Sequence, residues 1–152
     1  MAFTGNFMCT SFKLELLNGT HAFTTSVTRA TTAADTFKMA LYTSSATLDA
    51  STTAYTTSNE TTNTSGTAYV AGGNTLTGST TSSSGTTSFV DFADTSWTSA
   101  TFTARGALIY NSTQSNKSVV VLDFGSDKSV SAGTFTVVFP TADASNAIIR
   151  LA

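Results

Sequence analysis

The stretch TFTARGALIYNSTQSNKSVVVLDFGSDKSVSAGTFTVVFP, residues Thr101–Pro140, decides the fold of this chain. Its first and third runs alternate apolar and polar residues, which is the period of a half-buried β-strand. The middle run is apolar on both faces except at Asp123, as in a strand covered on two sides. The three predicted strands are Thr101–Tyr110, Ser118–Phe124 and Thr134–Phe139, and the predicted turns, rich in Asn, Ser, Asp and Gly, are Asn111–Lys117 and Gly125–Gly133.

The composition fits a single ordered domain over residues 1–152. Only 11% of the residues are charged, against about a quarter in ordinary globular proteins, and Ser and Thr make up about a third. Threonine is β-branched and suits strands, and its hydroxyl hydrates an outer face without charge. Eleven Phe, four Tyr and a single Pro distinguish the chain from a disordered Ser/Thr-rich stalk.

Shorter strands and one helix complete the prediction. The chain is expected to form an all-β fold, an antiparallel β-sandwich or jelly roll of about eight to ten strands with one short N-terminal helix. Ser11 is the expected helix cap and Asn18-Gly19 its end, and Gly78–Thr87 is a connector or a hairpin tip. The helix is Ser11–Asn18, and the further strands are Asp35–Tyr42, Thr67–Val70, Thr75–Thr77, Ser88–Ala93 and Ala147–Leu151.

Several classes of function find no support. The net charge is −2 with no basic patch, so nucleic-acid binding is not expected. One Cys and one His give neither an internal disulfide nor a metal site. No apolar run reaches the length of a membrane helix, and MAFTGNFMCT is not a signal peptide, so synthesis in a cytoplasm and release by lysis or assembly are expected.

No catalytic constellation is visible, so no enzyme activity, cofactor or catalytic residue is expected. Asp91 and Asp94 suit turn capping, and His21, beside a turn and with no partner nearby in the sequence, is expected to be a surface or capping residue. Asp123 interrupts an apolar strand and needs a donor, for which Arg105 on the neighbouring strand is the candidate. The sequence therefore predicts a structural Arg105–Asp123 pair.

Contacts with a partner are expected at the ends and in one long polar loop. Residues 1–10 are either a local strand or an arm that lies on a neighbouring subunit. Thr43–Gly66 is either a surface excursion that touches a neighbour or a mobile loop, and Leu48 and Tyr55 are its anchors. Trp97 is expected in a turn, as a core plug rather than a binding platform. The candidate interface residues are Phe3, Phe7, Met8, Leu48, Tyr55, Ile148 and Ile149.

Scattered motifs resemble the small structural, decoration- or cement-like virion proteins of tailed bacteriophages. Long Ser/Thr-rich loops, Thr43–Gly66 and Gly78–Thr87, are where the chain departs from that pattern. The motifs are LLNG (Leu16–Gly19), ALYTSS (Ala40–Ser45), AYVAGG (Ala68–Gly73), ARGALIY (Ala104–Tyr110) and DFGSDKS (Asp123–Ser129).

The resemblance implies a virion component. On this basis the chain is expected to be a capsid decoration protein that binds the major capsid protein on the outer shell, clamps its subunits and forms a dimer or trimer. One alternative is a tail or head fibre domain that binds a host-surface glycan through exposed aromatics such as Tyr55 and Trp97. Another is a ring component of the tail or neck.

Overall fold

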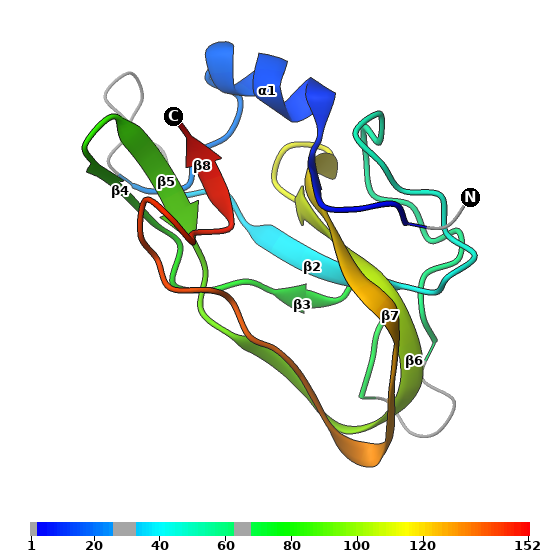
Figure 1. Ribbon diagram of the computed structural model, residues 1–152. Helices are drawn as coiled ribbons and strands as arrows, with labels where there is room; N and C mark the ends of the chain where they lie inside the picture. Colours follow the sequence, from blue (N-terminus) through cyan, green and yellow to red (C-terminus); the bar gives the residue numbers. More distant parts are fainter. Residues whose placement is uncertain (1–2, 26–32, 63–67) are drawn as a thin grey trace.

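The computed structural model describes residues 3–25, 33–62 and 68–152, which form two antiparallel sheets and one short helix (Figure 1). This arrangement agrees with the predicted all-β sandwich. The strand order is β1-β7-β6-β2-β3 in the large sheet and β4-β5-β8 in the small sheet. The elements are β1 Phe7–Met8, α1 Thr10–Leu17, β2 Phe37–Tyr42, β3 Asn74–Thr75, β4 Thr80–Ser84, β5 Thr87–Asp91, β6 Thr95–Asn111, β7 Lys117–Val137 and β8 Ile149–Leu151.

Strands β6 and β7 form one long ribbon, paired from Thr95 with Val137 to Asn111 with Lys117. The predicted turn between them is present, but the predicted second turn at Gly125–Gly133 is wrong, because this segment lies inside β7. Ala104 pairs with Lys128, and Gly106 pairs with Asp123. Between these two pairs β6 has one residue, Arg105, whereas β7 has four, residues 124–127, so β7 forms a bulge. Bulges and turns favour the same residue types, which explains the error.

The ribbon bends back over itself at the bottom of Figure 1. Register shifts fall on both strands there, and Ser99 and Ala132 adopt positive φ. Trp97 lies in β6 rather than in the predicted turn, and it is buried among Phe102 and Phe135 at ring distances of 6.4 and 6.1 Å. Trp97 is therefore a core residue, as expected, beneath a bent strand.

The helix begins at Thr10, and the prediction that Ser11 caps it is wrong. Cys9 is the N-cap, and no side chain caps the helix. Cys9 N–H donates to the Val119 carbonyl at 3.0 Å, so the chain passes directly from the edge of the large sheet into the helix. The predicted end is confirmed, since Asn18 is the C-cap and Gly19 has φ +67°.

The N-terminal segment packs on its own sheet. The Phe3 side chain is buried, and its ring lies over Gly106 of β6. A Cβ at Gly106 would come within 2.4 Å of the Leu122 carbonyl oxygen and 2.7 Å of the Phe3 ring, so only glycine permits this approach. Of the two expectations for residues 1–10, the local strand is the one observed for the described part, while residues 1–2 lie outside it.

The polar regions differ from the prediction at two places: Gly78–Thr87 contains a strand, and Ala68–Val70 does not. Gly78–Thr87 includes the whole of β4 and ends in a hairpin turn at Gly85, as the hairpin alternative required. Ala68–Val70 is not a strand, and Thr67 lies outside the described residues. The polar loop is held at several points as far as residue 62, and residues 63–66 lie outside the described part.

Candidate partner-binding groove

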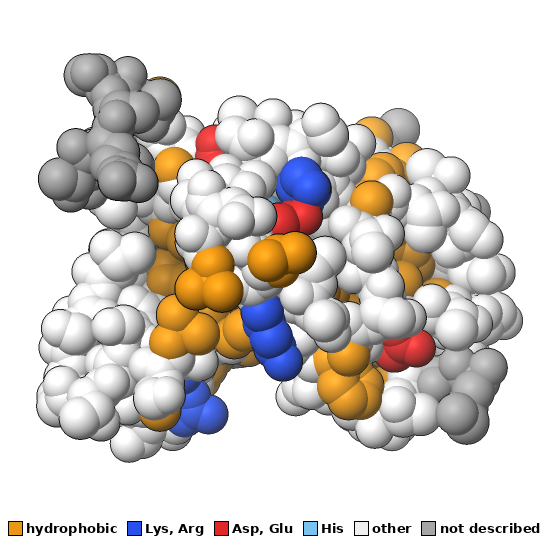
Figure 2. All heavy atoms as spheres, turned by 90° about the horizontal axis from the view of Figure 1, so that it is seen from above, with side chains coloured by type: hydrophobic (Ala, Val, Ile, Leu, Met, Phe, Trp, Pro, Cys, Tyr) orange, Lys and Arg blue, Asp and Glu red, His pale blue; other side chains and the backbone are white. Residues whose placement is uncertain are grey.

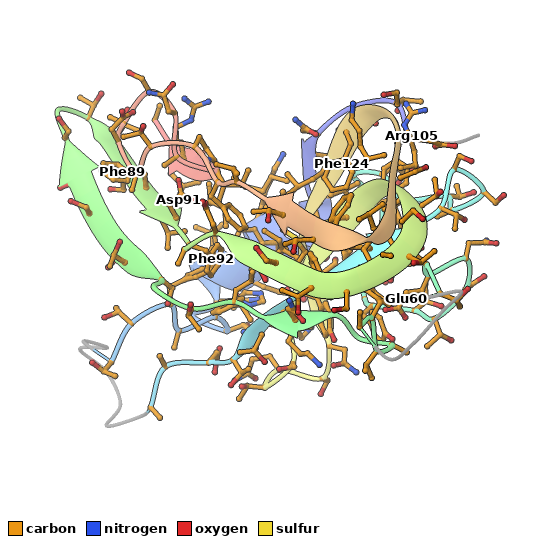
Figure 3. All side chains as sticks on the ribbon, turned by 90° about the horizontal axis from the view of Figure 1, so that it is seen from below. Glu60, Phe89, Asp91, Phe92, Arg105 and Phe124 are labelled. Atoms are coloured by element: carbon orange, nitrogen blue, oxygen red, sulfur yellow. The ribbon has the colours of Figure 1, made fainter. Side chains whose placement is uncertain are left out.

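A groove opens where the N-terminal segment, β7 and the segment before β8 meet. It consists of two hollows of about 500 and 350 Å³. Both hollows share Asn6, Leu122, Pro140 and Ile148, so they form one continuous surface, which we call the terminal groove. Figure 3 labels Phe124, which lines its larger part. The other lining residues are Phe7, Met8, Val120, Asp123, Lys128, Phe135, Thr136, Val137, Val138, Phe139, Asn146, Ala147 and Arg150.

One side of the groove is an unpaired strand edge. Strand β1 covers β7 only at Val120 and Val121. The Asp123 N–H then donates to Asn6 Oδ1 at 2.6 Å, and from Phe124 onward no described strand pairs with β7 on that side. An unpaired edge beside an apolar groove is the geometry in which an extended peptide adds to a sheet.

The predicted Arg105–Asp123 pair is present and borders this groove. Arg105 Nε donates to Asp123 Oδ1 at 2.9 Å, and the Nη2 atom lies 3.4 Å from Oδ2. The hydrogen bond from Arg105 holds the pKa of Asp123 below its ordinary value, and the same bond raises the pKa of Arg105. The pair is part-exposed rather than in the core, so it fixes the bulge of β7 at the rim of the groove.

The predicted interface residues fall into two groups. Phe7, Met8 and Ile148 come together in the terminal groove, although they lie at opposite ends of the chain. Phe3, Leu48 and Ile149 are buried, with 5%, 5% and 3% of their surface exposed, so they pack against this chain's own core.

Tyr55 is half-buried against the core, and its ring stacks on that of Tyr110 at a centroid distance of 4.6 Å. Its hydroxyl donates to Glu60 Oε2 at 2.7 Å. Leu48 and Tyr55 thus anchor the polar loop, as predicted; Leu48 is buried and Tyr55 is half-buried. The loop is further fastened by bridges from Ala54 to Lys117 and from Glu60 to Tyr42.

Glu60 is a buried carboxylate held by uncharged donors. The Tyr69 hydroxyl and the Gly72 N–H both donate to its Oε1 at 2.7 Å, while Tyr55 donates to Oε2. The Tyr69 hydroxyl also accepts the Leu41 N–H at 2.8 Å, which ties the carboxylate to β2. Figure 3 labels Glu60 in the loop region that these bonds fasten.

All four tyrosines of the chain gather around this carboxylate. The Tyr110 hydroxyl donates to the Gly72 carbonyl at 2.9 Å, and the Tyr42 hydroxyl donates to the Thr56 carbonyl at 2.6 Å. Burial raises the pKa of Tyr110 to about 12 and raises that of Tyr42, Tyr55 and Tyr69 above their ordinary value. The cluster fastens the polar loop to the large sheet.

His21 is a buried network residue rather than the surface or capping residue expected from the sequence. Its side chain is 0% exposed, and its Nε2 lies 2.8 Å from Glu15 Oε2. The Asn111 side-chain amide donates to His21 Nδ1 at 3.0 Å and to Asp35 at 2.6 Å. Lys117 completes the chain of contacts by donating to Glu15 Oε1 at 2.5 Å.

Asp91 and Asp94 bind backbone amides, but apart from the Phe92 N–H these amides lie far away in the sequence and not in the local turn that was predicted. Asp91 accepts the N–H groups of Phe92 and Ile148 at 2.9 and 3.3 Å, and Asp94 accepts that of Phe139 at 2.8 Å. Burial raises the pKa of Asp91. Through these bonds the two carboxylates fasten the segment that carries one wall of the terminal groove.

Sequence reasoning missed the groove residues Asn6, Phe124, Val138 and Pro140. Phe124 and Val138 look like ordinary members of alternating strands, and only the bend of the ribbon brings them to one surface. In the part of the chain that the structure describes, no three His, Cys, Asp or Glu side chains are placed to hold a metal ion. No helix there is long and apolar enough to span a bilayer.

No protein-family model, curated protein or solved structure matches the chain.

Proposed function

We propose that the chain is a capsid decoration protein of a tailed bacteriophage, and that its terminal groove holds an extended apolar segment of the major capsid protein. The observation that carries this proposal is the groove itself, an open surface of apolar side chains with a polar rim beside the unpaired edge of β7. Main-chain hydrogen bonds to β7 would hold the segment, and its alternate side chains would enter the groove.

The neutral composition supports attachment to a large assembly. With 11% charged residues the chain as a whole carries few groups for ion pairs, although Asp123, Lys128 and Arg150 line the groove. A protein that binds the assembled shell stabilises that shell by mass action, and many equal contacts over a lattice add by multivalency. A modest affinity per groove is therefore sufficient for decoration.

Two of the motifs on which the expected resemblance to phage virion proteins rests lie beside the groove. DFGSDKS (Asp123–Ser129) contains the bulge of β7 at the rim of the groove, and ARGALIY (Ala104–Tyr110) pairs with β7 on both sides of that bulge. The resemblance and the groove thus fall on the same part of the molecule, which favours a virion role for this surface.

The glycan-binding alternative requires exposed aromatic rings at Tyr55 and Trp97, and the structure does not favour it. Trp97 is 2% exposed and presents no ring to a sugar, and the half-buried Tyr55 already stacks on Tyr110 and donates its hydroxyl proton to Glu60. A ring component of the tail or neck differs from a decoration protein in copy number. Hundreds of copies spread over the shell support decoration, while a few copies at one vertex contradict it.

A single exposed residue tests the groove. Val138 lines it and is 71% exposed, so Val138→Asp places a charge in the groove with little effect on the fold. The matched control is Val70→Asp, at a position that is 67% exposed and does not line the groove. The measurement is co-sedimentation with undecorated capsids assembled from the phage's major capsid protein.

We expect Val138→Asp to weaken shell binding at least about tenfold, because a charge would be desolvated in each contact. Val70→Asp should bind like the unmodified chain. Full occupancy of the shells by Val138→Asp would reject the groove as the binding surface. Absence of binding by the unmodified chain would reject the decoration function.

A further inference from the structure

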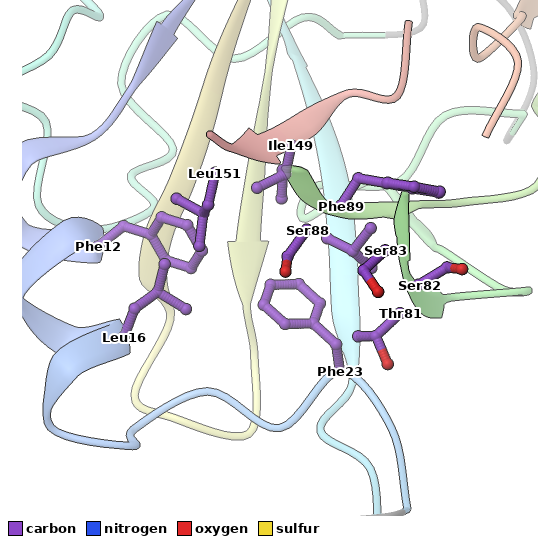
Figure 4. A pocket seen from close by; sticks show the side chains of 11 residues that line it. Phe12, Leu16, Phe23, Thr81, Ser82, Ser83, Ser88, Phe89, Ile149 and Leu151 are labelled. Atoms are coloured by element: carbon purple, nitrogen blue, oxygen red, sulfur yellow. The ribbon is translucent and has the colours of Figure 1, made fainter. Parts of the chain in front are cut away.

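The last strand, β8, has a different kind of hollow on each of its two faces. Successive side chains of a strand point to opposite faces of the sheet. Ile149 and Leu151 line a hollow of about 520 Å³ between α1 and the small sheet, and all of its lining side chains are uncharged (Figure 4). Arg150, which stands between them in the sequence, lines the smaller part of the terminal groove instead. The alternation along β8 therefore places a cation in the groove.

The charges of the terminal groove are not balanced. Charge is sparse in this chain, and on the face drawn in Figure 2 the charged side chains are few and scattered. The charged residues that line the groove are Asp123, Lys128 and Arg150. The Asp123 carboxylate is already bound by Arg105. The other two, Lys128 and Arg150, belong to none of the described ion pairs, and both are positive.

The smaller hollow of the groove holds hydrogen-bond donors that suit a carboxylate. Arg150 is exposed there, and its guanidinium presents a planar fork of N–H groups that matches the two oxygens of a carboxylate. Asn6 lines the same hollow and is also exposed. Its Oδ1 accepts the Asp123 N–H, and no described hydrogen bond uses its Nδ2, which is therefore a second donor.

Two further carboxylates lie near these cations, but neither lines the groove. Asp127 precedes Lys128 in the bulge of β7. Hydrogen bonds from Asn146 lower the pKa of Asp143, and the nearby Arg150 charge lowers that pKa to a smaller extent. The Asp143 oxygens accept the backbone and side-chain amides of Asn146, and no described ion pair joins Asp143 to Arg150. The Arg150 guanidinium thus keeps its donors for a bound segment.

We propose that the segment held by the terminal groove carries an acidic side chain, which binds Arg150 and Asn6 in the smaller hollow while apolar side chains fill the larger hollow. This step rests on the proposed function for the segment itself and adds its chemistry. A charge pair at a rim contributes little affinity but fixes the register. Because side chains of an extended segment alternate, a shift by one residue would turn the acidic side chain away from Arg150.

Charge reversal at Arg150 tests the proposal in co-sedimentation with undecorated shells. We expect Arg150→Met to weaken binding about threefold and Arg150→Glu about tenfold, since the first removes an attraction and the second adds a repulsion. The matched control is Lys13→Glu, at an exposed lysine of α1 that lines neither part of the groove, and it should bind like the unmodified chain. Added salt should weaken binding of the unmodified chain more than binding of Arg150→Met.

Synthetic peptides separate this proposal from the decoration function. The peptides share an alternating valine–serine sequence with blocked ends and carry Glu, Gln or Lys at one position, which is moved along the peptide. Fluorescence anisotropy with the full chain at low salt should rank Glu tightest and Lys weakest, and Arg150→Met should remove the ranking.

Equal shell binding by Arg150→Glu and Lys13→Glu would overturn the acidic preference and leave the groove itself to the Val138→Asp test. If the unmodified chain does not bind shells, the decoration function is rejected and the peptides alone decide the preference. No peptide binding, or equal affinity for the Glu and Lys peptides, would then overturn it.

Discussion

Two glutamates, Glu15 and Glu60, are equally buried, at 8% exposure each, but the protein accommodates their charges in different ways. Glu15, on α1, faces two basic side chains. Lys117 Nζ lies 2.5 Å from one carboxylate oxygen, and His21 Nε2 lies 2.8 Å from the other. The attraction of the lysine charge compensates for most of the hydration energy that the Glu15 carboxylate loses on burial.

The Lys38 ammonium lies near Gly72 in the Glu60 cluster, but none of the described ion pairs involves Glu60. The Glu60 oxygens accept instead from two tyrosine hydroxyls and one backbone amide. Hydrogen bonds to an ionised acceptor are stronger than those between neutral groups, and three of them satisfy much of its bonding capacity.

The difference teaches where pH and salt should act on this fold. A carboxylate stabilised by a part-exposed lysine should respond to acid and to screening. A carboxylate stabilised by buried hydroxyls should depend on those hydroxyls staying protonated and in place. Glu15 thus couples α1 to β7 by charge, while Glu60 couples the polar loop to β2 and β6 by neutral donors.

Alkaline titration should have the largest effect on stability, because it deprotonates the tyrosine hydroxyls that donate to buried acceptors. The raised pKa values mean that the folded state holds the tyrosine protons more tightly than the unfolded state. This contribution to stability is complete below the ordinary tyrosine pKa of about 10 and is lost as pH rises through the higher folded values. We expect cooperative unfolding at high pH, with tyrosinate absorbance and loss of circular dichroism rising together. Stepwise formation of tyrosinate near pH 10 in a chain that stays folded would contradict this.

Removal of the Glu60 carboxylate comes next. Glu60→Ala leaves three donors without an acceptor in a buried site, and we expect a loss of about 3–5 kcal/mol in the free energy of unfolding. Glu60→Gln keeps one oxygen acceptor and should cost less. Urea denaturation measures both, and Asp127→Ala, at an exposed carboxylate, is the control and should stay within about 0.5 kcal/mol. A cost below about 1 kcal/mol for Glu60→Ala would show that the tyrosines do not need the carboxylate.

The strands of the central block could be predicted because apolar and polar residues alternate along them, which shows which side chains are buried. Thr101–Tyr110 and Ser118–Phe124 lie in β6 and β7 as expected, and the Arg105–Asp123 pair followed from one charge in an apolar run. The ribbon bend could not be predicted, since glycine and polar residues at Gly125–Gly133 serve a bulge as well as they serve a turn.

The two glutamate sites and the terminal groove could not be found from the sequence for a different reason. Glu60 stands in a polar loop where nothing indicates burial, and its partners Tyr69 and Gly72 are nine and twelve residues away. Glu15 and Lys117 are separated by 102 residues. Contacts of this kind depend on the tertiary fold, which local periodicity does not encode.

The Lys117 contact should have the smallest effect and the clearest dependence on conditions. Burial alone would raise the pKa of Glu15, but the hydrogen bonds from Lys117 and His21 outweigh it and hold the pKa below its ordinary value. A lowered pKa stabilises the fold above the ordinary glutamate pKa of about 4.3, and this contribution is lost as pH falls through the folded value. The Lys117 side chain is 38% exposed, so we expect Lys117→Met to cost about 1 kcal/mol at neutral pH.

The comparison variant is Tyr55→Phe, which removes one neutral donor from Glu60 and should also cost about 1 kcal/mol. Chemical denaturation with urea, which adds no ionic strength, should be repeated at low and high salt and at acid pH. The cost of Lys117→Met should shrink with salt and vanish once Glu15 is protonated, whereas the cost of Tyr55→Phe should not change with salt. Equal salt dependence of the two variants would show that the buried carboxylates are not stabilised in different ways, because screening acts on the lysine charge and has no counterpart at a hydroxyl.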